Sequence, residues 1–234
     1  IIYDAWVRDL VYSDAGVSGV IARINGSTQT VAAGAVVLAC GGFEANTEWR
    51  PSYLGRGWES AKVRGTKYKT GDGLAMALRI GAQAYGNWSG CHSVSWDRYA
   101  PDYGELGLTT IFPRHGYPFG IMVNADGKRF LDEGADFRNY TYAKYGGFVL
   151  EQPGQFAWQI FDSKVLHLLL HQYRTKYITK VQANTLEELA DKLEDMTARM
   201  HATSPLRYMP PISESLPAQA AVLLRKLADE VARL

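Results

Sequence analysis

The segment GAVVLACGGFEAN, residues 34–46, contains an apolar run that ends in two consecutive glycines. A short apolar run bounded by glycine is typical of a buried strand. Gly41 and Gly42 have no side chains to keep another group away from the backbone, so a bound cofactor could lie directly against it. Two glycines permit a tight crossing of two chain segments equally well, and on the sequence both interpretations stay open.

Three motifs follow the two glycines in order along the chain. TGDG, residues 70–73, opens a segment with the apolar spacing of a helix, for which Gly81 is the predicted left-handed stop. GIMVNADGKRF spans residues 120–130, and Arg138 follows in GADFRNYTYAKYG. Asp72 lies near the predicted helix start, where a carboxylate can simply cap backbone N–H groups. Arg138 supplies a planar guanidinium, and its fork of donors suits a carboxylate.

Two more basic side chains lie in FPRHGYP, residues 112–118. Arg114 and His115 could bind a carboxylate, since both can donate hydrogen bonds to an anion. Pro113 and Gly116, on either side of them, suit an ordinary turn equally well.

Other groups with suggestive chemistry favour a structural interpretation. His167 and His171 have the i, i+4 spacing of a metal pair, but VLHLLLH offers no third ligand, so we expect no metal site. Cys91 has no evident base or cation beside it in the sequence, which argues against a nucleophile.

Composition limits the class of protein. The 234 residues are 47% apolar and carry a formal net charge of +1. This charge argues against nucleic-acid binding, which needs a basic stripe, and no apolar run reaches the ~20 residues of a membrane span. The two cysteines are too few for a disulfide framework and fit a reducing compartment, so we expect a cytoplasmic protein.

The pattern of apolar and turn residues predicts an α+β fold in three parts. Residues 1–46 alternate in polarity and have turns at 14–16 and 25–27, which indicates a β-meander followed by the buried strand. Residues 47–193 mix short helices and strands. Residues 194–234 read as a helical tail of uncertain assignment.

Within the middle part, GIMVNADGKRFL predicts two strands about a turn at residues 125–127. Alternation then places Ile121, Val123 and Phe130 in the core and residues 124–128 in solvent. FAWQIFD predicts a further strand, and Ser163 would cap an apolar helix after it. Thr185 and Glu188 form a capping box ahead of a helix with apolar residues at 3–4 spacing.

Together these motifs resemble the flavoproteins of the succinate dehydrogenase and fumarate reductase family, in which a capping domain interrupts a FAD domain. The segments that carry the resemblance are CGGFEAN, AKVRGTKYKTGDG, WSGCHSVSWD, YPFGIMVNADGKRFLDEGADFRNYTYAKYG and AWQIFD. The resemblance implies that residues 1–46 are a remnant of the Rossmann-like FAD-binding domain and that residues 47–193 are the capping domain.

Within that family the chain is most similar to the branch that oxidises tricarballylate to cis-aconitate. The resemblance implies hydride transfer from a polycarboxylate to FAD, coupled to loss of a proton from the adjacent carbon, with an unidentified electron acceptor that reoxidises the flavin. A fumarate, succinate or other carboxylate oxidoreductase of the same family is the alternative.

The resemblance also implies roles for individual residues. Gly41, Gly42 and Asp72 match positions that contact FAD. His92 and Thr110 match residues that hold a substrate carboxylate, although Ile111 replaces the acidic residue that usually follows the threonine. Arg114 and His115 would then be further substrate contacts.

Arg138 matches the catalytic arginine that exchanges a proton with the substrate. An arginine pKa above 12 leaves almost no neutral form near pH 7, so this role needs a dry pocket or a proton relay. Asp132, Glu133 and Asp136 are the candidate relay groups, and without them Arg138 is an electrostatic clamp.

A dinucleotide fingerprint of the GxGxxG type is absent from these residues, and the chain opens with IIYDAW and no methionine. We therefore expect a fragment that holds no FAD when purified alone. A non-catalytic module that binds a carboxylate or a partner without flavin stays open as a second hypothesis.

Overall fold

The computed structural model describes residues 1–108 and 111–202. Within them the chain forms two compact units. Unit 1 comprises Ile1–Gly90 and Asp102–Glu105, and unit 2 comprises Cys91–Pro101 with the described residues from Leu106 onward. These units are defined by the contacts within each of them. The predicted domains, 1–46, 47–193 and 194–234, follow instead from the resemblance to the flavoprotein family, and they stay predictions.

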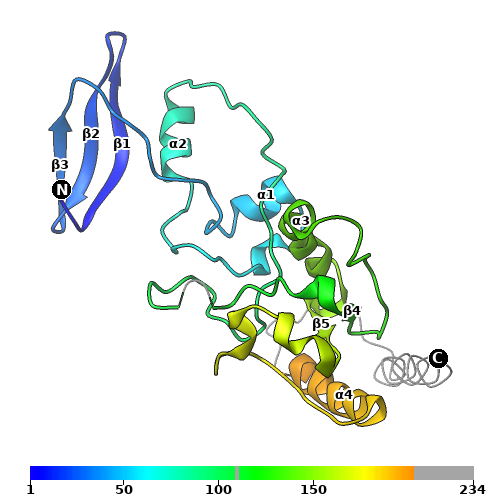
Figure 1. Cartoon of the computed structure of the whole chain (residues 1–234). Helices are drawn as coiled ribbons and strands as arrows, with labels where there is room; N and C mark the ends of the chain where they lie inside the picture. The colour runs from blue at the N-terminus through cyan, green and yellow to red at the C-terminus, as the bar shows by residue number, and fades with distance from the viewer. Residues whose placement is uncertain (109–110, 203–234) are drawn as a thin grey trace. The chain divides into compact units, whose positions relative to one another are not determined.

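Unit 1 opens with the predicted antiparallel meander. Its strands are β1 (Ala5–Ser13), β2 (Gly16–Ile24) and β3 (Ser27–Ala32), in that order across the sheet (Figure 1). Asn25 and Gly26 join β2 to β3 with φ angles of 50° and 83°. A type I′ hairpin needs two positive φ values, and Asn-Gly adopts them at low cost, so the sequence signal is confirmed here.

The segment after β3 differs from the prediction. Residues 34–42 form no strand, and Val37 is 88% exposed. An apolar segment becomes a strand only when a neighbour completes its backbone hydrogen bonds, and no strand among the described residues pairs with this one. The predicted buried strand is therefore wrong for the described chain.

The rest of unit 1 contains α1 (Trp49–Leu54), a short 3₁₀ turn at Trp58–Ser60 and α2 (Asp72–Arg79). Gly81 has a φ of 90° just beyond α2, which confirms the predicted helix and its glycine stop. Four aromatic rings pack together, each against the other three, with centroids 5.0–6.3 Å apart: Phe43, Trp49, Tyr53 and Trp88.

Unit 2 contains a two-stranded antiparallel sheet of β4 (Ile121–Asn124) and β5 (Ala157–Ile160). Its α-helices are α3 (Arg138–Leu150) and α4 (Leu186–Ala202). Short 3₁₀ helices lie at Tyr117–Phe119, Pro153–Gln155, Ser163–Leu168 and His171–Arg174. One core cluster joins the 3₁₀ helix at Tyr117–Phe119 to β4 and α3 through Tyr117, Met122 and Tyr145.

The predicted hairpin at residues 120–131 is confirmed only in its first half. β4 pairs with β5, and the second predicted strand is reduced to a single bridge between Val123 and Arg129. Asn124 and Ala125 are buried, contrary to the prediction. The physical reason is that the Asn124 side chain holds the turn, because its Oδ1 accepts hydrogen bonds from the N–H groups of Asp126 and Lys128.

The apolar segment after β5 forms two 3₁₀ helices, Ser163–Leu168 and His171–Arg174, and not the predicted single helix. Leu169 lies between them in an extended conformation and is buried, which interrupts the helical backbone. Asp162, and not Ser163, caps the first of them, since its carboxylate accepts a hydrogen bond from the Lys164 N–H at 2.8 Å.

α4 matches its predicted start and its apolar stripe. Thr185 Oγ1 accepts from the Glu188 N–H at 3.1 Å, while the Glu188 carboxylate returns to the N–H of Asn184. Ala190 and Leu193 are buried in a cluster with residues of β5. The remainder of the predicted tail, residues 203–234, lies outside the described residues. No helix in the described part of the chain has the length and apolar character to cross a membrane.

Candidate substrate and cofactor sites

Three of the predicted substrate residues lie around one ring in unit 2. The imidazole of His92 is 5.0 Å from the Tyr142 ring, centroid to centroid, and that of His115 is 5.1 Å away. The guanidinium carbon of Arg138 lies over the same ring at 5.8 Å. One positive group and two imidazoles, from three separate segments of the chain, therefore share a single neighbour.

α3 supplies two members of this cluster. Arg138 is its first residue and Tyr142 follows four residues later, so both side chains lie on one face of the helix. Arg138 is exposed, and its side-chain hydrogen bond within the described residues goes to Asn139 Oδ1 at 3.1 Å. Most of the guanidinium's donors are thus available to an anion.

The position of His92 is set by a close crossing of two chain segments. Ser93 donates its backbone N–H to the Ala143 carbonyl at 2.6 Å, and its Oγ accepts from the Gly147 N–H at 2.9 Å. A Cβ on Gly146 would lie 2.6 Å from the backbone of Ser93. Glycine at this place lets the segment after His92 lie directly on α3, which brings the imidazole to Tyr142.

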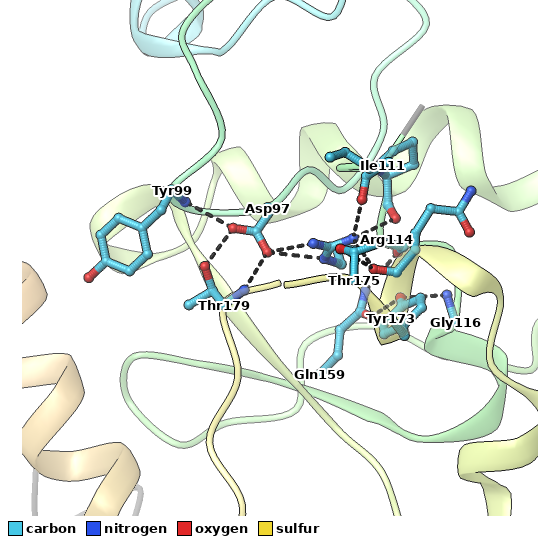
Figure 2. Close-up of polar contacts among 11 residues, drawn as sticks. Asp97, Tyr99, Ile111, Arg114, Gly116, Gln159, Tyr173, Thr175 and Thr179 are labelled. Atoms are coloured by element: carbon cyan, nitrogen blue, oxygen red, sulfur yellow. Dashed lines mark hydrogen bonds and ion pairs between the residues drawn. The ribbon is translucent and has the colours of Figure 1, made fainter. Parts of the chain in front are cut away.

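Hydrogen bonds to Arg114 and Gly116, the residues on either side of His115, hold the backbone at this place (Figure 2). Gln159 of β5 donates to the Arg114 carbonyl at 2.9 Å, and the Gly116 N–H donates to the Tyr173 hydroxyl at 2.7 Å. The Tyr173 hydroxyl in turn donates to Gln159 Oε1 at 2.6 Å. This closed set of bonds fixes the backbone from which His115 extends.

Arg114 is not placed as the predicted substrate contact. It is buried, and its Nε and Nη2 donate to one oxygen of Asp97 at 3.2 and 2.7 Å (Figure 2). Its Nη1 donates to the backbone carbonyls of Ile111, Pro113 and Gln172. A guanidinium with its donors engaged inside the protein serves the fold, and the role of Arg114 as a substrate ligand stays a prediction.

Asp97 is the centre of that buried network. Besides Arg114, it accepts hydrogen bonds from the Thr179 hydroxyl and N–H and from the Tyr99 N–H. Burial by itself raises the pKa of Asp97, but the hydrogen bonds from Thr179 and Arg114 and the Arg114 charge outweigh it and lower the pKa below its ordinary value. The carboxylate is therefore held in its charged form.

The candidate proton relay is occupied elsewhere. Glu133 is buried, and its carboxylate accepts from the Met122 N–H and from Arg129. The carboxylates of Asp132 and Asp136 accept from the N–H groups of Gly134 and Phe137. In the described residues none of the three carboxylates bonds to Arg138, so the geometry supports its use as a clamp.

Two other predicted features lie away from this cluster or outside the description. Thr110 lies outside the described residues. His167 and His171 are on separate short helices and are exposed. Within residues 1–108 and 111–202, no group of three His, Cys, Asp or Glu side chains could hold a metal ion.

The predicted cofactor residues belong to unit 1. Gly41 has a φ of 75°, which disfavours any side chain, and its Cβ position would lie 3.3 Å from the Lys69 side chain. A Cβ on Gly42 would lie 3.0 Å from the Glu44 carboxylate, and Glu44 and Lys69 form an ion pair. The main chain at Gly41 and Gly42 therefore has no side chains of its own and lies beside the positive charge of Lys69 and the negative charge of Glu44.

Asp72 begins α2, and its carboxylate is oriented by two donors. Thr70 Oγ1 donates to one oxygen at 2.7 Å and the Trp6 indole N–H donates to the other at 3.0 Å. The residue before it, Gly71, caps the helix with no side-chain hydrogen bond. A side-chain-free backbone and a fixed carboxylate at a helix start are groups that fit a dinucleotide such as FAD, since its hydroxyls donate and its phosphates accept.

Sequence reasoning missed Asp97 and Tyr142. Asp97 stands 17 residues before Arg114 with no local pattern to join them. Tyr142 had one available signal, its i, i+4 relation to Arg138, but an aromatic residue at helical spacing is more often part of the core.

The sequence profile of the FAD binding domain family matches residues 1–216 of the chain. The chain is 29% identical over 212 residues to a 3-oxosteroid 1-dehydrogenase of Mycobacterium tuberculosis, a match that covers 79% of this chain and 35% of the relative. It is 35% identical over 204 residues to a 4-oxocyclohexanecarboxylate 2-dehydrogenase of Sinomonas cyclohexanicum, with 79% of this chain and 33% of the relative covered. A probable fumarate reductase of Shewanella frigidimarina, Ifc3, is 33% identical over 139 residues, and this match covers 58% of this chain and 21% of the relative.

Solved structures agree with these relatives. The open conformation of a flavocytochrome c3 fumarate reductase matches with a TM-score of 0.61 and 27% identity, over 85% of this chain and 34% of that chain. A 3-ketosteroid delta1-dehydrogenase from Sterolibacterium denitrificans matches with a TM-score of 0.59 and 25% identity, over 85% of this chain and 38% of that one. The chain spans about a third of the length of these relatives. On its profile match and on this fold, the chain belongs to the FAD binding domain family, with fumarate reductases and steroid dehydrogenases among its relatives.

Proposed function

We propose that this chain is part of a FAD-dependent oxidoreductase that acts on a CH–CH bond beside a carboxylate, with tricarballylate as the substrate and cis-aconitate as the product. The observation that carries the proposal is the gathering of His92, His115 and Arg138 around Tyr142. A polycarboxylate needs several donors on one surface, and these three side chains provide them.

Bound FAD supplies the acceptor for a hydride, that is, for two electrons and one hydrogen. The chain's own residues do the rest. Arg138 clamps a substrate carboxylate through its planar fork, and the two imidazoles donate to the same or a second carboxylate. The substrate loses a hydride from one carbon to the flavin and a proton from the next carbon to solvent, to which the Arg138 position is exposed, so a double bond forms between the two carbons.

Arg138 also stabilises charge during loss of the proton. Removing a proton beside a carboxylate places negative charge on the substrate, and a guanidinium held next to it lowers that cost. The buried Asp97 and Arg114 pair does not touch the substrate in this scheme. It holds the backbone that presents His115.

Two groups of relatives support different substrates. Fumarate and 4-oxocyclohexanecarboxylate, in the names of two relatives, are carboxylates, which agrees with an anion-binding cluster. The 3-oxosteroid of a third relative is the rival substrate class. A flavin-free binding module is disfavoured, because the family profile covers most of the chain.

The test uses the FAD-loaded enzyme that contains this chain, with a dye as electron acceptor. Tricarballylate oxidation, succinate oxidation, fumarate reduction and 3-oxosteroid oxidation are compared by kcat/KM. We expect tricarballylate to exceed the others by at least about tenfold, because each unpaired donor in the site penalises a substrate that lacks a carboxylate. Turnover of the steroid with no turnover of any carboxylate would overturn the proposal.

A further inference from the structure

Tyr142 is the side chain that joins the three proposed substrate contacts. Its ring meets the imidazoles of His92 and His115 at interplanar angles of 73° and 87°. Both are edge-to-face arrangements, which are the favoured geometry for aromatic neighbours. The Arg138 guanidinium lies over the same ring within the range of a cation–π contact.

The hydroxyl of Tyr142 has no hydrogen-bond partner among the residues that the structure describes, and the residue is half-buried. The contacts of Tyr142 with His92, His115 and Arg138 are therefore made by its ring. The three neighbours arrive from different places: His92 lies on the segment that crosses α3, His115 lies between Arg114 and Gly116, and Arg138 starts α3. The contact that all three have in common is the Tyr142 ring.

We propose that Tyr142 is a positioning residue whose ring holds His92, His115 and Arg138 as one anion-binding surface. The inference rests on the proposed function for the identity of the anion, a polycarboxylate. The arrangement of the side chains comes from their contacts with the Tyr142 ring and is independent of the proposed function. Leucine at this position would fill part of the volume but offer neither an aromatic edge nor a π face. Phenylalanine would keep both and lose only the hydroxyl.

The first measurement needs no substitution. In the 234-residue chain with labelled histidine and tyrosine, ring protons of Tyr142 should show NOEs to the imidazole protons of both His92 and His115, because the centroids are 5.0 and 5.1 Å apart. Absence of both NOEs in the folded chain overturns the proposal, whatever the substrate is.

The second measurement compares Tyr142→Leu with Tyr142→Phe. In the FAD-loaded enzyme, Tyr142→Leu should raise KM for tricarballylate by roughly tenfold, with a smaller effect on kcat, since ordered donors bind the carboxylates alike before and during reaction. The imidazole resonances of His92 and His115 should shift in the same variant. Tyr142→Phe should leave the resonances in place and keep KM within about twofold.

Tyr140→Leu is the matched control, since Tyr140 is a largely exposed tyrosine on the same helix, at 72% exposure. It should change neither the resonances nor KM. An equal rise of KM in the Phe and Leu variants would assign the effect to the hydroxyl and overturn the proposal. If the wild-type enzyme oxidises no carboxylate while the NOEs and the resonance shifts are observed, the proposed substrate fails and the positioning role stands.

Discussion

Arg138 is exposed at the start of α3, and its side chain has one hydrogen bond among the described residues, to Asn139. Its guanidinium lies over the Tyr142 ring, and among the described residues it forms no hydrogen bond or ion pair with Asp132, Glu133 or Asp136. A clamp on a substrate carboxylate therefore fits its surroundings better than proton transfer by the arginine alone. The clamp depends on the shape of the side chain as well as on its charge.

Arg138→Lys tests this dependence. Lysine keeps the charge but loses the planar fork and reaches less far, so kcat/KM of the FAD-loaded enzyme should fall by several orders of magnitude, to roughly 0.1% or less of the wild-type value. Thermal stability should be nearly unchanged, because the side chain is exposed. Lys144→Arg on the same helix is the control and should keep full activity. If the Arg138→Lys variant turned over substrate as fast as the wild-type enzyme, the proposed role of Arg138 in the site would be wrong.

Asp97 and Arg114 give the clearest expectation for stability. Asp97→Asn leaves the Arg114 guanidinium buried without its counter-ion, so the free energy of unfolding at pH 7 should fall by about 3–5 kcal/mol. Urea titration measures this loss. Asp102→Asn is the control, because the Asp102 side chain is exposed and its pair with Lys62 should contribute less than about 1 kcal/mol.

The same pair predicts a pH dependence. The pKa of Asp97 is lowered on folding, so its contribution to stability is complete above the ordinary aspartate pKa of about 3.9 and is lost as pH falls through the lower folded pKa. Wild-type stability should therefore drop below about pH 4, and the drop should be smaller in Asp97→Asn. An identical acid limb in both proteins would show that Asp97 is not the titrating group.

At the scale of elements, α3 works as a platform for the site. It supplies Arg138 and Tyr142, and its two glycines, Gly146 and Gly147, receive the segment that follows His92. β5 acts from the other side through Gln159, which fixes the backbone before His115. The site is therefore assembled by backbone contacts, and the functional side chains extend from held positions.

Gly146→Ala tests this platform. Alanine normally favours a helix over glycine by up to about 1 kcal/mol, but here its Cβ would lie 2.6 Å from the Ser93 backbone. We expect the variant to be less stable and the His92 imidazole resonance to shift. Gly134→Ala is the control, since the nearest atom to its Cβ would be at 3.7 Å, an ordinary contact. A stabilised variant with an unmoved His92 resonance would contradict the crossing.

At the scale of the whole molecule, the chain forms two compact units, and the proposed substrate cluster and cofactor residues belong to different ones. His92, His115 and Arg138 are in unit 2, while Gly41, Gly42 and Asp72 are in unit 1. The chain spans about a third of the length of the 3-oxosteroid 1-dehydrogenase that it matches, and its 234 residues contain no GxGxxG fingerprint.

This composition of the chain predicts its behaviour toward flavin. The 234 residues purified alone should hold far less than one FAD per chain, because the pyrophosphate is normally held by a glycine-rich turn and helix start of the GxGxxG type. Absorbance of the flavin against protein absorbance measures the ratio. A yellow preparation near one flavin per chain would show that Gly41, Gly42 and Asp72 suffice for binding.

The sequence by itself determined the local features of this protein. The Asn25–Gly26 turn, the stop of α2 at Gly81 and the start of α4 at Thr185 depend on residues a few positions apart, and the structure confirms them. His92, His115 and Arg138 were also identified from motifs and resemblance. That all three lie around the Tyr142 ring is known only from the structure.

The tertiary structure decided what depends on distant partners. Residues 34–42 have the composition of a buried strand, yet they form none among the described residues, because a strand needs a neighbour to complete its hydrogen bonds. Arg114 has the chemistry of a substrate ligand, yet Asp97 neutralises it from 17 positions away. A sequence pattern shows which donors a side chain carries, and only the fold shows whether the protein has already engaged them.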